Sequence, residues 1–152
     1  MTESAIHILL VEDNPNDVEL TLHALAARGV TAEIHVARDG AEALEFLLGG
    51  PHAAPRGSPA LVLLDLRLPR VDGLEVLRRM RSHARTRALP VVVLTSSRDD
   101  RDVFECRQHG VAGYIVKPVD FGQFLEAVRT LGLRGLAFER TPAAGGRTGA
   151  AA

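Results

Sequence analysis

The chain has 152 residues, of which 46% are hydrophobic and 24% are charged, and this balance is typical of one soluble globular domain with a real core. Its formal net charge is −1, so no overall field attracts nucleic acid or an anionic membrane, and we expect neither as a partner. The single cysteine, Cys106, excludes an intramolecular disulfide and a cysteine metal cluster.

The first apolar run, residues 6–11, ends at Glu12. No basic region precedes this run, and it is too short for a signal peptide or a membrane span. We therefore expect a cytoplasmic protein.

Four further apolar runs predict four more strands. They cover residues 32–37, 60–64, 90–94 and 113–116. Stretches with helical periodicity follow the five runs in turn. These stretches begin near Pro15, Asp39, Gly73, Asp99 and Asp120. Because the first, third and fourth runs are apolar almost throughout, their strands should be covered on both faces, which predicts a doubly wound, five-stranded parallel α/β sheet.

Two segments differ in composition from the rest of the chain. Residues 49–59 are rich in glycine and proline and predict a long connection, and the chain after Thr141 is of low complexity. We expect one domain over residues 1–132, a C-terminal extension over 133–140 that can serve as an interface arm, and a disordered tail over 141–152.

Polar residues follow four of the predicted strands. They are Glu12 and Asp13, Asp65, Thr95 and Ser96, and Lys117. Each of them alone has an ordinary explanation as a helix cap, a turn or a strand end. Ligands of open parallel sheets, however, bind in the crevice at the carboxyl ends of the strands. The whole set at one edge therefore favours a binding site.

The charges of this set indicate the chemistry. Three carboxylates in one crevice repel one another unless a cation joins them, and Mg²⁺ (or Mn²⁺) prefers such oxygen ligands. The two charges of the metal and that of Lys117 would balance the three carboxylates. A carboxylate such as Asp65 can act as a covalent nucleophile, so the site suits phosphoryl transfer.

The motifs ILLVEDN, LLDLRLPRVDG, VVLTSS and YIVKP occur in this order between residues 6 and 131. With them the chain resembles the receiver domain of response regulators in two-component signalling. The resemblance implies a flavodoxin-like fold with the strand order 2-1-3-4-5.

The resemblance also implies a role for each pocket residue. Asp65 would be the phosphoacceptor, and Mg²⁺ would be held by Glu12, Asp13, Asp65 and the main-chain carbonyl of Arg67. Many family members have two aspartates where this chain has Glu12 and Asp13, so we expect Asp13 to bind the metal directly and Glu12 to bind it through water. The side chain of Arg67 is long and cationic and could lie over the pocket.

The remaining implied roles concern the phosphoryl group. Lys117 would contact it, and Pro118 would follow a cis peptide bond. Thr95 and Tyr114 match the pair that switches conformation when the acceptor is phosphorylated.

The implied function is that of a signalling receiver without a separate turnover substrate. It accepts a phosphoryl group from a phosphohistidine kinase and changes its partner-binding surface. The EDNPND opening, the insertion at 49–59 and the short chain after Leu131 are similar to small response regulators paired with bacterial phytochrome kinases. A shuttle role in a multistep phosphorelay is an alternative.

Other classes fit the sequence less well. An aspartyl-phosphate phosphatase of the haloacid dehalogenase type needs a second aspartate two positions after its nucleophile, and Arg67 stands there. A dinucleotide site needs a glycine-rich loop after the first strand, which is absent.

The apolar residues Leu133, Leu136 and Phe138 continue past the predicted domain. We expect them to contribute to a homodimer formed through the fourth helix, fifth strand and fifth helix. Docking of the same segment on the kinase by a monomer is the alternative. The six histidines show no metal-binding spacing and are expected to be structural, and Cys106 is expected to be a half-buried small residue.

Overall fold

The computed structural model describes residues 6–27, 29, 32–49, 58–118, 120, 122–124 and 126. The predicted interface arm at 133–140 and the predicted tail at 141–152 lie outside these residues. So do residues 50–57 of the predicted long connection.

Five parallel strands form one sheet in the order β2-β1-β3-β4-β5. The strands are β1 (His7–Val11), β2 (Glu33–Ala37), β3 (Leu61–Leu64), β4 (Val91–Thr95) and β5 (Gly113–Val116). The doubly wound fold and its strand order are thus confirmed. Each strand begins and ends within one residue of the apolar run that predicted it.

Four helices connect the strands. They are α1 (Pro15–Ala27), α2 (Gly40–Leu48), α3 (Gly73–Ser82) and α4 (Asp100–Gln108), and residues 122–124 and 126 are also helical. Two predicted starts, Asp39 and Asp99, are N-caps instead, because their carboxylates accept hydrogen bonds from the backbone N–H of Glu42 and Arg101 at 2.8 and 2.9 Å.

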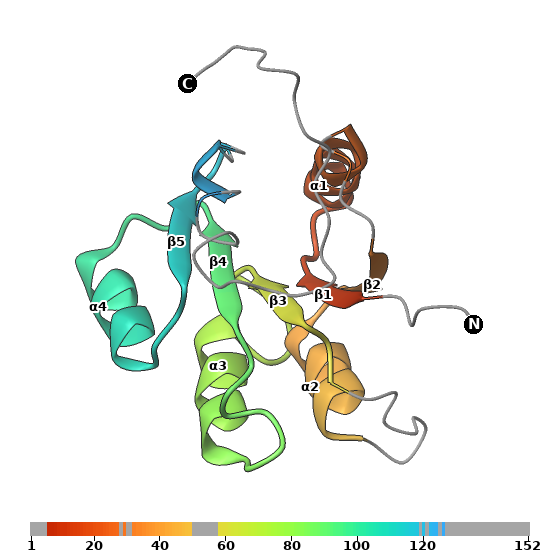
Figure 1. Ribbon diagram of the computed structural model, residues 1–152. Coiled ribbons are helices and arrows are strands. Elements are labelled where there is room, and N and C mark those ends of the chain that lie inside the picture. Colours follow the sequence, from red (N-terminus) through yellow and green to blue (C-terminus); the bar gives the residue numbers. More distant parts are fainter. Residues whose placement is uncertain are drawn as a thin grey trace.

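Helices cover both faces of the sheet: α1 lies on one side and α2 and α3 lie on the other (Figure 1). Leu9 and Val11 of β1 pack in the layer with α2, α3 and α4, whereas Ile8 and Leu10 pack in the layer with α1 and Phe124. All residues of β3 and β4 are buried. This confirms that the apolar runs without alternation are strands buried on both faces.

Two glycines bring backbone segments together next to the loop that follows β3. A Cβ atom on Gly73, the first residue of α3, would lie 2.2 Å from the carbonyl oxygen of Asp65, and one on Gly40 would lie 1.8 Å from that of Val71. The Gly73 N–H donates to the Leu66 carbonyl at 2.9 Å. Only a residue without Cβ lets α3 begin this close to Asp65 and fix the loop around it.

Cys106 is completely buried in α4, more deeply than the sequence suggested. Burial raises the pKa of its thiol to about 12, so the residue packs as a small hydrophobe. No helix among the described residues is both long enough and apolar enough to cross a membrane.

Candidate functional site

The carboxyl ends of β1, β3 and β5 bring the predicted charged residues together. Ligand oxygens of Glu12, Asp13 and Asp65 all lie within 4.8 Å of one another. Glu12 and Asp65 are buried, whereas Asp13 is exposed at the rim. The three carboxylates therefore form a pocket with one side open to solvent.

Lys117 is the cation of this pocket. Its Nζ donates to Glu12 Oε1 at 2.6 Å, to Asp17 Oδ2 at 2.8 Å and to Asp65 Oδ2 at 2.9 Å. Burial alone would lower the pKa of Lys117, but the hydrogen bonds to these carboxylates outweigh it and raise the pKa. The lysine therefore stays charged. The peptide bond that follows, between Lys117 and Pro118, is cis.

Asp17 is a member of the pocket that the sequence reasoning missed. It lies in the first turn of α1, one turn of helix beyond the strand end that carries Asp13. With Asp17 the pocket holds four carboxylates, three of which accept from the one ammonium, so it carries one negative charge more than the set predicted from the sequence. The excess favours a divalent cation, and oxygen donors of this kind are the ligands that Mg²⁺ and Mn²⁺ prefer.

Asp65 is held at both ends of its carboxylate. Oδ2 accepts from Lys117, and Oδ1 accepts from the backbone N–H of Arg67 at 3.1 Å. Its own N–H donates to the Val11 carbonyl at 3.0 Å. The carboxylate is thus oriented before any ligand binds.

Glu12 lies in the most buried part of the pocket, with 3% of its surface exposed. Its Oε2 accepts from the Asn14 N–H at 3.1 Å. Burial, together with the neighbouring charge of Asp65, raises the pKa of Glu12 to about 7 even though Lys117 opposes the shift. Glu12 therefore exchanges its proton near neutral pH in the metal-free protein.

Thr95 and Tyr114 meet at a common residue, Ser97. The Thr95 hydroxyl is completely buried and accepts from the Ser97 N–H at 3.3 Å, and the Tyr114 hydroxyl donates to the Ser97 carbonyl at 3.0 Å. Burial raises the pKa of Tyr114, so its hydroxyl keeps the proton that it donates. Ser96, the other predicted hydroxyl, is exposed.

The side chain of Arg67 extends toward α4. Its guanidinium donates to Asp102 Oδ2 at 2.8 Å and to Ser97 Oγ at 3.3 Å, and the Ser97 hydroxyl also donates to Asp102. Ser97 belongs to the VVLTSS motif, but nothing in the sequence pairs Arg67 with Asp102. The loop after Asp65 is thereby bonded to the first turn of α4.

Two of the six histidines, which were expected to be structural, contact each other. His7 and His35 lie 2.9 Å apart, next to Glu33. They are neighbours because β1 and β2 are paired, which spacing along the sequence does not reveal.

A family model described as the response regulator receiver domain matches residues 8–129. The chain belongs to this receiver family. As a member of it, the protein is a two-component signalling receiver and not a turnover enzyme, so the phosphatase alternative is dropped.

Three relatives show how similar the receiver is to known proteins. It is 41% identical to the "Probable methanogenesis regulatory protein FilR2" of Methanothrix harundinacea, covering 92% of this chain and 90% of the relative. The structure of the bacteriophytochrome response regulator AtBRR is 50% identical, with a TM-score of 0.76 and coverage of 86% and 94%. The Mn²⁺-bound form of response regulator Rcp1 is 31% identical, with a TM-score of 0.74 and coverage of 89% and 99%.

The raised pKa of Glu12 predicts how pH changes the stability of the metal-free receiver. A carboxyl with a raised folded-state pKa contributes stability that is complete below its ordinary pKa of 4.5 and is lost as the pH rises through about 7. Between pH 5 and 8, wild type should lose about 2–3 kcal/mol of unfolding free energy relative to Glu12→Gln. Urea unfolding with a chelator present measures this difference.

The exposed Glu19 of α1 supplies the matched control. The difference between wild type and Glu12→Gln should change far more over this pH range than the difference between wild type and Glu19→Gln. If the two differences changed alike, the carboxyl of Glu12 would not account for the pH dependence.

Proposed function

We propose that this receiver accepts a phosphoryl group on Asp65 from the phosphohistidine of a sensor kinase. The observation that carries the proposal is the position of the Asp65 carboxylate, which is fixed between the Lys117 ammonium and the Arg67 N–H inside a pocket with excess negative charge. A fixed carboxylate beside a cation is a preorganised nucleophile.

The donor set fits a divalent cation. Asp13, Asp65 and the main-chain carbonyl of Arg67 would bind Mg²⁺ directly and Glu12 through water, consistent with the hydrogen bonds that already occupy both oxygens of Glu12. When bound, the metal neutralises the equatorial oxygens of the transferred phosphoryl group. The relative Rcp1 has been solved in a Mn²⁺-bound form, which supports a divalent cation in this receiver.

The transfer forms one bond and breaks one. A carboxylate oxygen of Asp65 attacks phosphorus, and the phosphorus–nitrogen bond of the donor breaks with its electron pair returning to the imidazole. Lys117 already donates to this carboxylate, so its ammonium stands beside the incoming phosphoryl oxygens. It offsets the negative charge that they bring into the pocket.

Thr95 and Tyr114 are proposed to sense the product. Phosphoryl oxygens would draw the Thr95 hydroxyl away from Ser97, and Tyr114 would then exchange its bond to the Ser97 carbonyl for a more buried position. This is a shift between two packings of the β4–α4 loop, and α4 carries the change to the surface.

The kinase partner is proposed from the relatives. A receiver implies a histidine kinase. AtBRR is a bacteriophytochrome response regulator, and RcpA, solved in its phosphorylated form, is a cyanobacterial phytochrome response regulator. We propose a bacterial phytochrome as the kinase, with a phosphorelay shuttle as the alternative. The proposed receiver domain is 1–132, with 133–140 as an interface arm and 141–152 as a tail.

We further propose a homodimer through α4, β5 and the helix that follows β5. Phe104 of α4 is 64% exposed, which is unusual for a large aromatic side chain. Leu133, Leu136 and Phe138 would add to this surface, although they lie outside the described residues. A monomer that docks the same surface on the kinase is the alternative.

The first prediction of the proposed function tests the acceptor. With a small-molecule phosphodonor and Mg²⁺, intact-mass spectrometry should show one added phosphoryl group on wild type and none on Asp65→Asn. Chelation of the metal should abolish the modification. Asp100→Asn, the same change at an exposed aspartate of α4, is the control and should be modified like wild type. Equal modification of Asp65→Asn would place the acceptor elsewhere.

The second prediction tests the switch. Thr95→Ala should still be phosphorylated but should lose the phosphorylation-dependent chemical-shift changes of α4 amides in NMR spectra, because the hydroxyl that senses the phosphoryl group is gone. Thr95→Ser keeps the hydroxyl and should retain the changes. Identical responses of Thr95→Ala and wild type would require another route from Asp65 to α4.

The third prediction tests the dimer. Light scattering of the full chain at tens of micromolar should give a dimer mass, and Phe104→Glu should give a monomer mass because it places a charge in the apolar interface. Leu20→Glu, at a similarly exposed leucine on α1, should remain dimeric. A monomer mass for wild type, with and without phosphodonor, contradicts the dimer.

A further inference from the structure

A second group of potential metal ligands lies at the end of β1 remote from the acidic pocket. It consists of His7, Glu33 and His35. His7 begins β1 and Val11 ends it, so at 3.3 Å per residue the cluster begins about 13 Å from the strand end that leads into the pocket. None of the three residues has a part in the proposed phosphoryl transfer.

The parallel pairing of two strands puts the three side chains on one face. His7 of β1 is paired with Glu33 of β2, and the next residue on the same face of β2 is His35, which is paired with Leu9. Leu9 packs in the core layer that contains α2. The cluster therefore lies on the α2 side of the sheet, at the edge that β2 forms.

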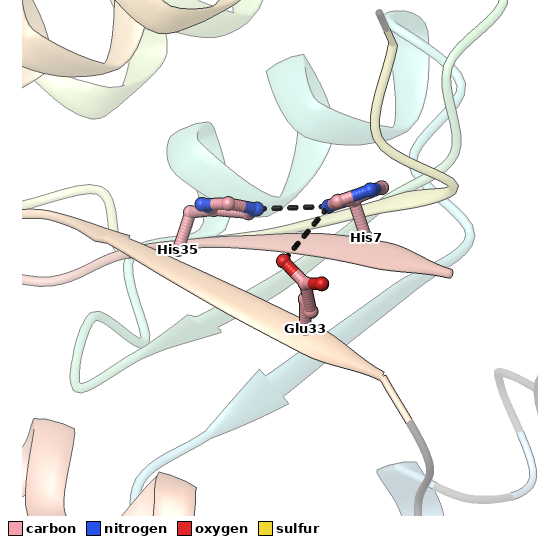
Figure 2. A group of neighbouring side chains, drawn as sticks. All are labelled: His7, Glu33 and His35. Carbon is pink, nitrogen blue, oxygen red and sulfur yellow. Dashed lines mark hydrogen bonds and ion pairs between the residues drawn. The ribbon is translucent and has the colours of Figure 1, made fainter. Parts of the chain in front are cut away.

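The donor atoms converge within the cluster (Figure 2). His7 Nδ1 lies 2.9 Å from His35 Nε2 and 3.8 Å from Glu33 Oε1. Zinc bonds of about 2.0–2.1 Å at tetrahedral angles place neighbouring donor atoms about 3.3 Å apart. One of these two separations is slightly shorter than this value and the other is slightly longer, and all three donor atoms lie within 4.8 Å of one another, so their spacing is close to that of a zinc site.

The surroundings hold the rings but leave the cluster accessible. The His35 ring contacts the Phe46 ring of α2 at a centroid distance of 5.0 Å and stacks on His7 at 5.1 Å. The side chains of His7 and Glu33 are 36% and 62% exposed. Water can therefore reach a metal held here and occupy a fourth position.

We propose that His7, His35 and Glu33 bind a divalent transition-metal ion of the zinc class. Two imidazoles and one carboxylate with an open fourth position are an established donor set for zinc. In the metal-free pair, one of the two facing nitrogens carries a proton that the other accepts. The metal takes the place of this proton, which moves to the other nitrogen of the same ring.

The ligand types separate this site from the acidic pocket. Imidazole nitrogen suits Zn²⁺, Cu²⁺ and Ni²⁺, whereas carboxylate and carbonyl oxygens suit Mg²⁺ and Mn²⁺. The receiver would therefore bind two different ions, one at each end of β1. Zinc at the cluster would also link the edge strand β2 to β1 through side chains, in addition to the backbone ladder.

Calorimetric titration of the full chain with ZnCl₂ tests the proposal. Excess Mg²⁺ in a non-chelating buffer keeps zinc out of the acidic pocket. Wild type should bind one Zn²⁺ per chain at this site, and His7→Gln and Glu33→Gln should each lose more than about tenfold in affinity. His23→Gln, a change of an exposed histidine on α1, is the matched control and should bind like wild type.

Two further measurements make the result specific. Imidazole ¹⁵N spectra should show zinc-dependent shifts of His7 Nδ1 and His35 Nε2. Asp65→Asn should bind Zn²⁺ with wild-type affinity, so a failure of the proposed phosphoryl transfer would leave this result unchanged. The proposal is overturned if His7→Gln and Glu33→Gln both bind zinc like His23→Gln, or if wild type shows no site with this stoichiometry.

Discussion

The ammonium of Lys117 is the only cation that contacts the buried carboxylates of the pocket among the residues that the structure describes. Glu12, Asp17 and Asp65 all accept from it. Glu12 and Asp65 are buried, and burial of unpaired carboxylates costs several kcal/mol. One ammonium cannot neutralise them, so part of this cost persists in the metal-free protein and appears as the raised pKa of Glu12. The fold thereby maintains an affinity for further positive charge at the place where a phosphoryl group would arrive.

This arrangement depends on strand ends that are fixed by both layers of the core. The backbone N–H of Lys117 donates to the Thr95 carbonyl at 2.8 Å, and that of Asp65 donates to Val11 at 3.0 Å. The end of β5 is thus tied to β4, and the end of β3 to β1. Because β3 and β4 are buried throughout and β1 nearly so, the ends of these three strands cannot shift without disturbing the packing of helices. On the α3 side, Gly73 lets the helix begin directly against the backbone of Asp65 and so fixes the same end of β3.

How well the sequence predicted each feature depends on how far apart along the chain the interacting residues lie. Apolar runs, caps and breaks are local signals, so the strands, the helix starts at Pro15 and Gly73 and the edge that carries the pocket could be read directly. Asp17 was missed because an aspartate in the first turn of a helix is ordinarily explained by the helix dipole. The contacts of Arg67 with Asp102 and of His7 with His35 join residues 35 and 28 positions apart. Such contacts depend on how neighbouring elements pack, which residue spacing does not specify.

Ser97 is the point at which the loop after β3 and the strand β5 meet. Its hydroxyl accepts from Arg67, which follows Asp65 by two residues, and its carbonyl accepts from Tyr114. Its N–H donates to the buried Thr95 hydroxyl. A movement of the Thr95 hydroxyl toward Asp65 must therefore lengthen or break its bond to the Ser97 N–H, unless Ser97 moves with it. The bonds that Arg67 and Tyr114 donate to Ser97 oppose such a movement of Ser97. Because the Ser97 hydroxyl also donates to Asp102, a buried residue of α4, a displacement of this one residue would disturb a direct bond to that helix.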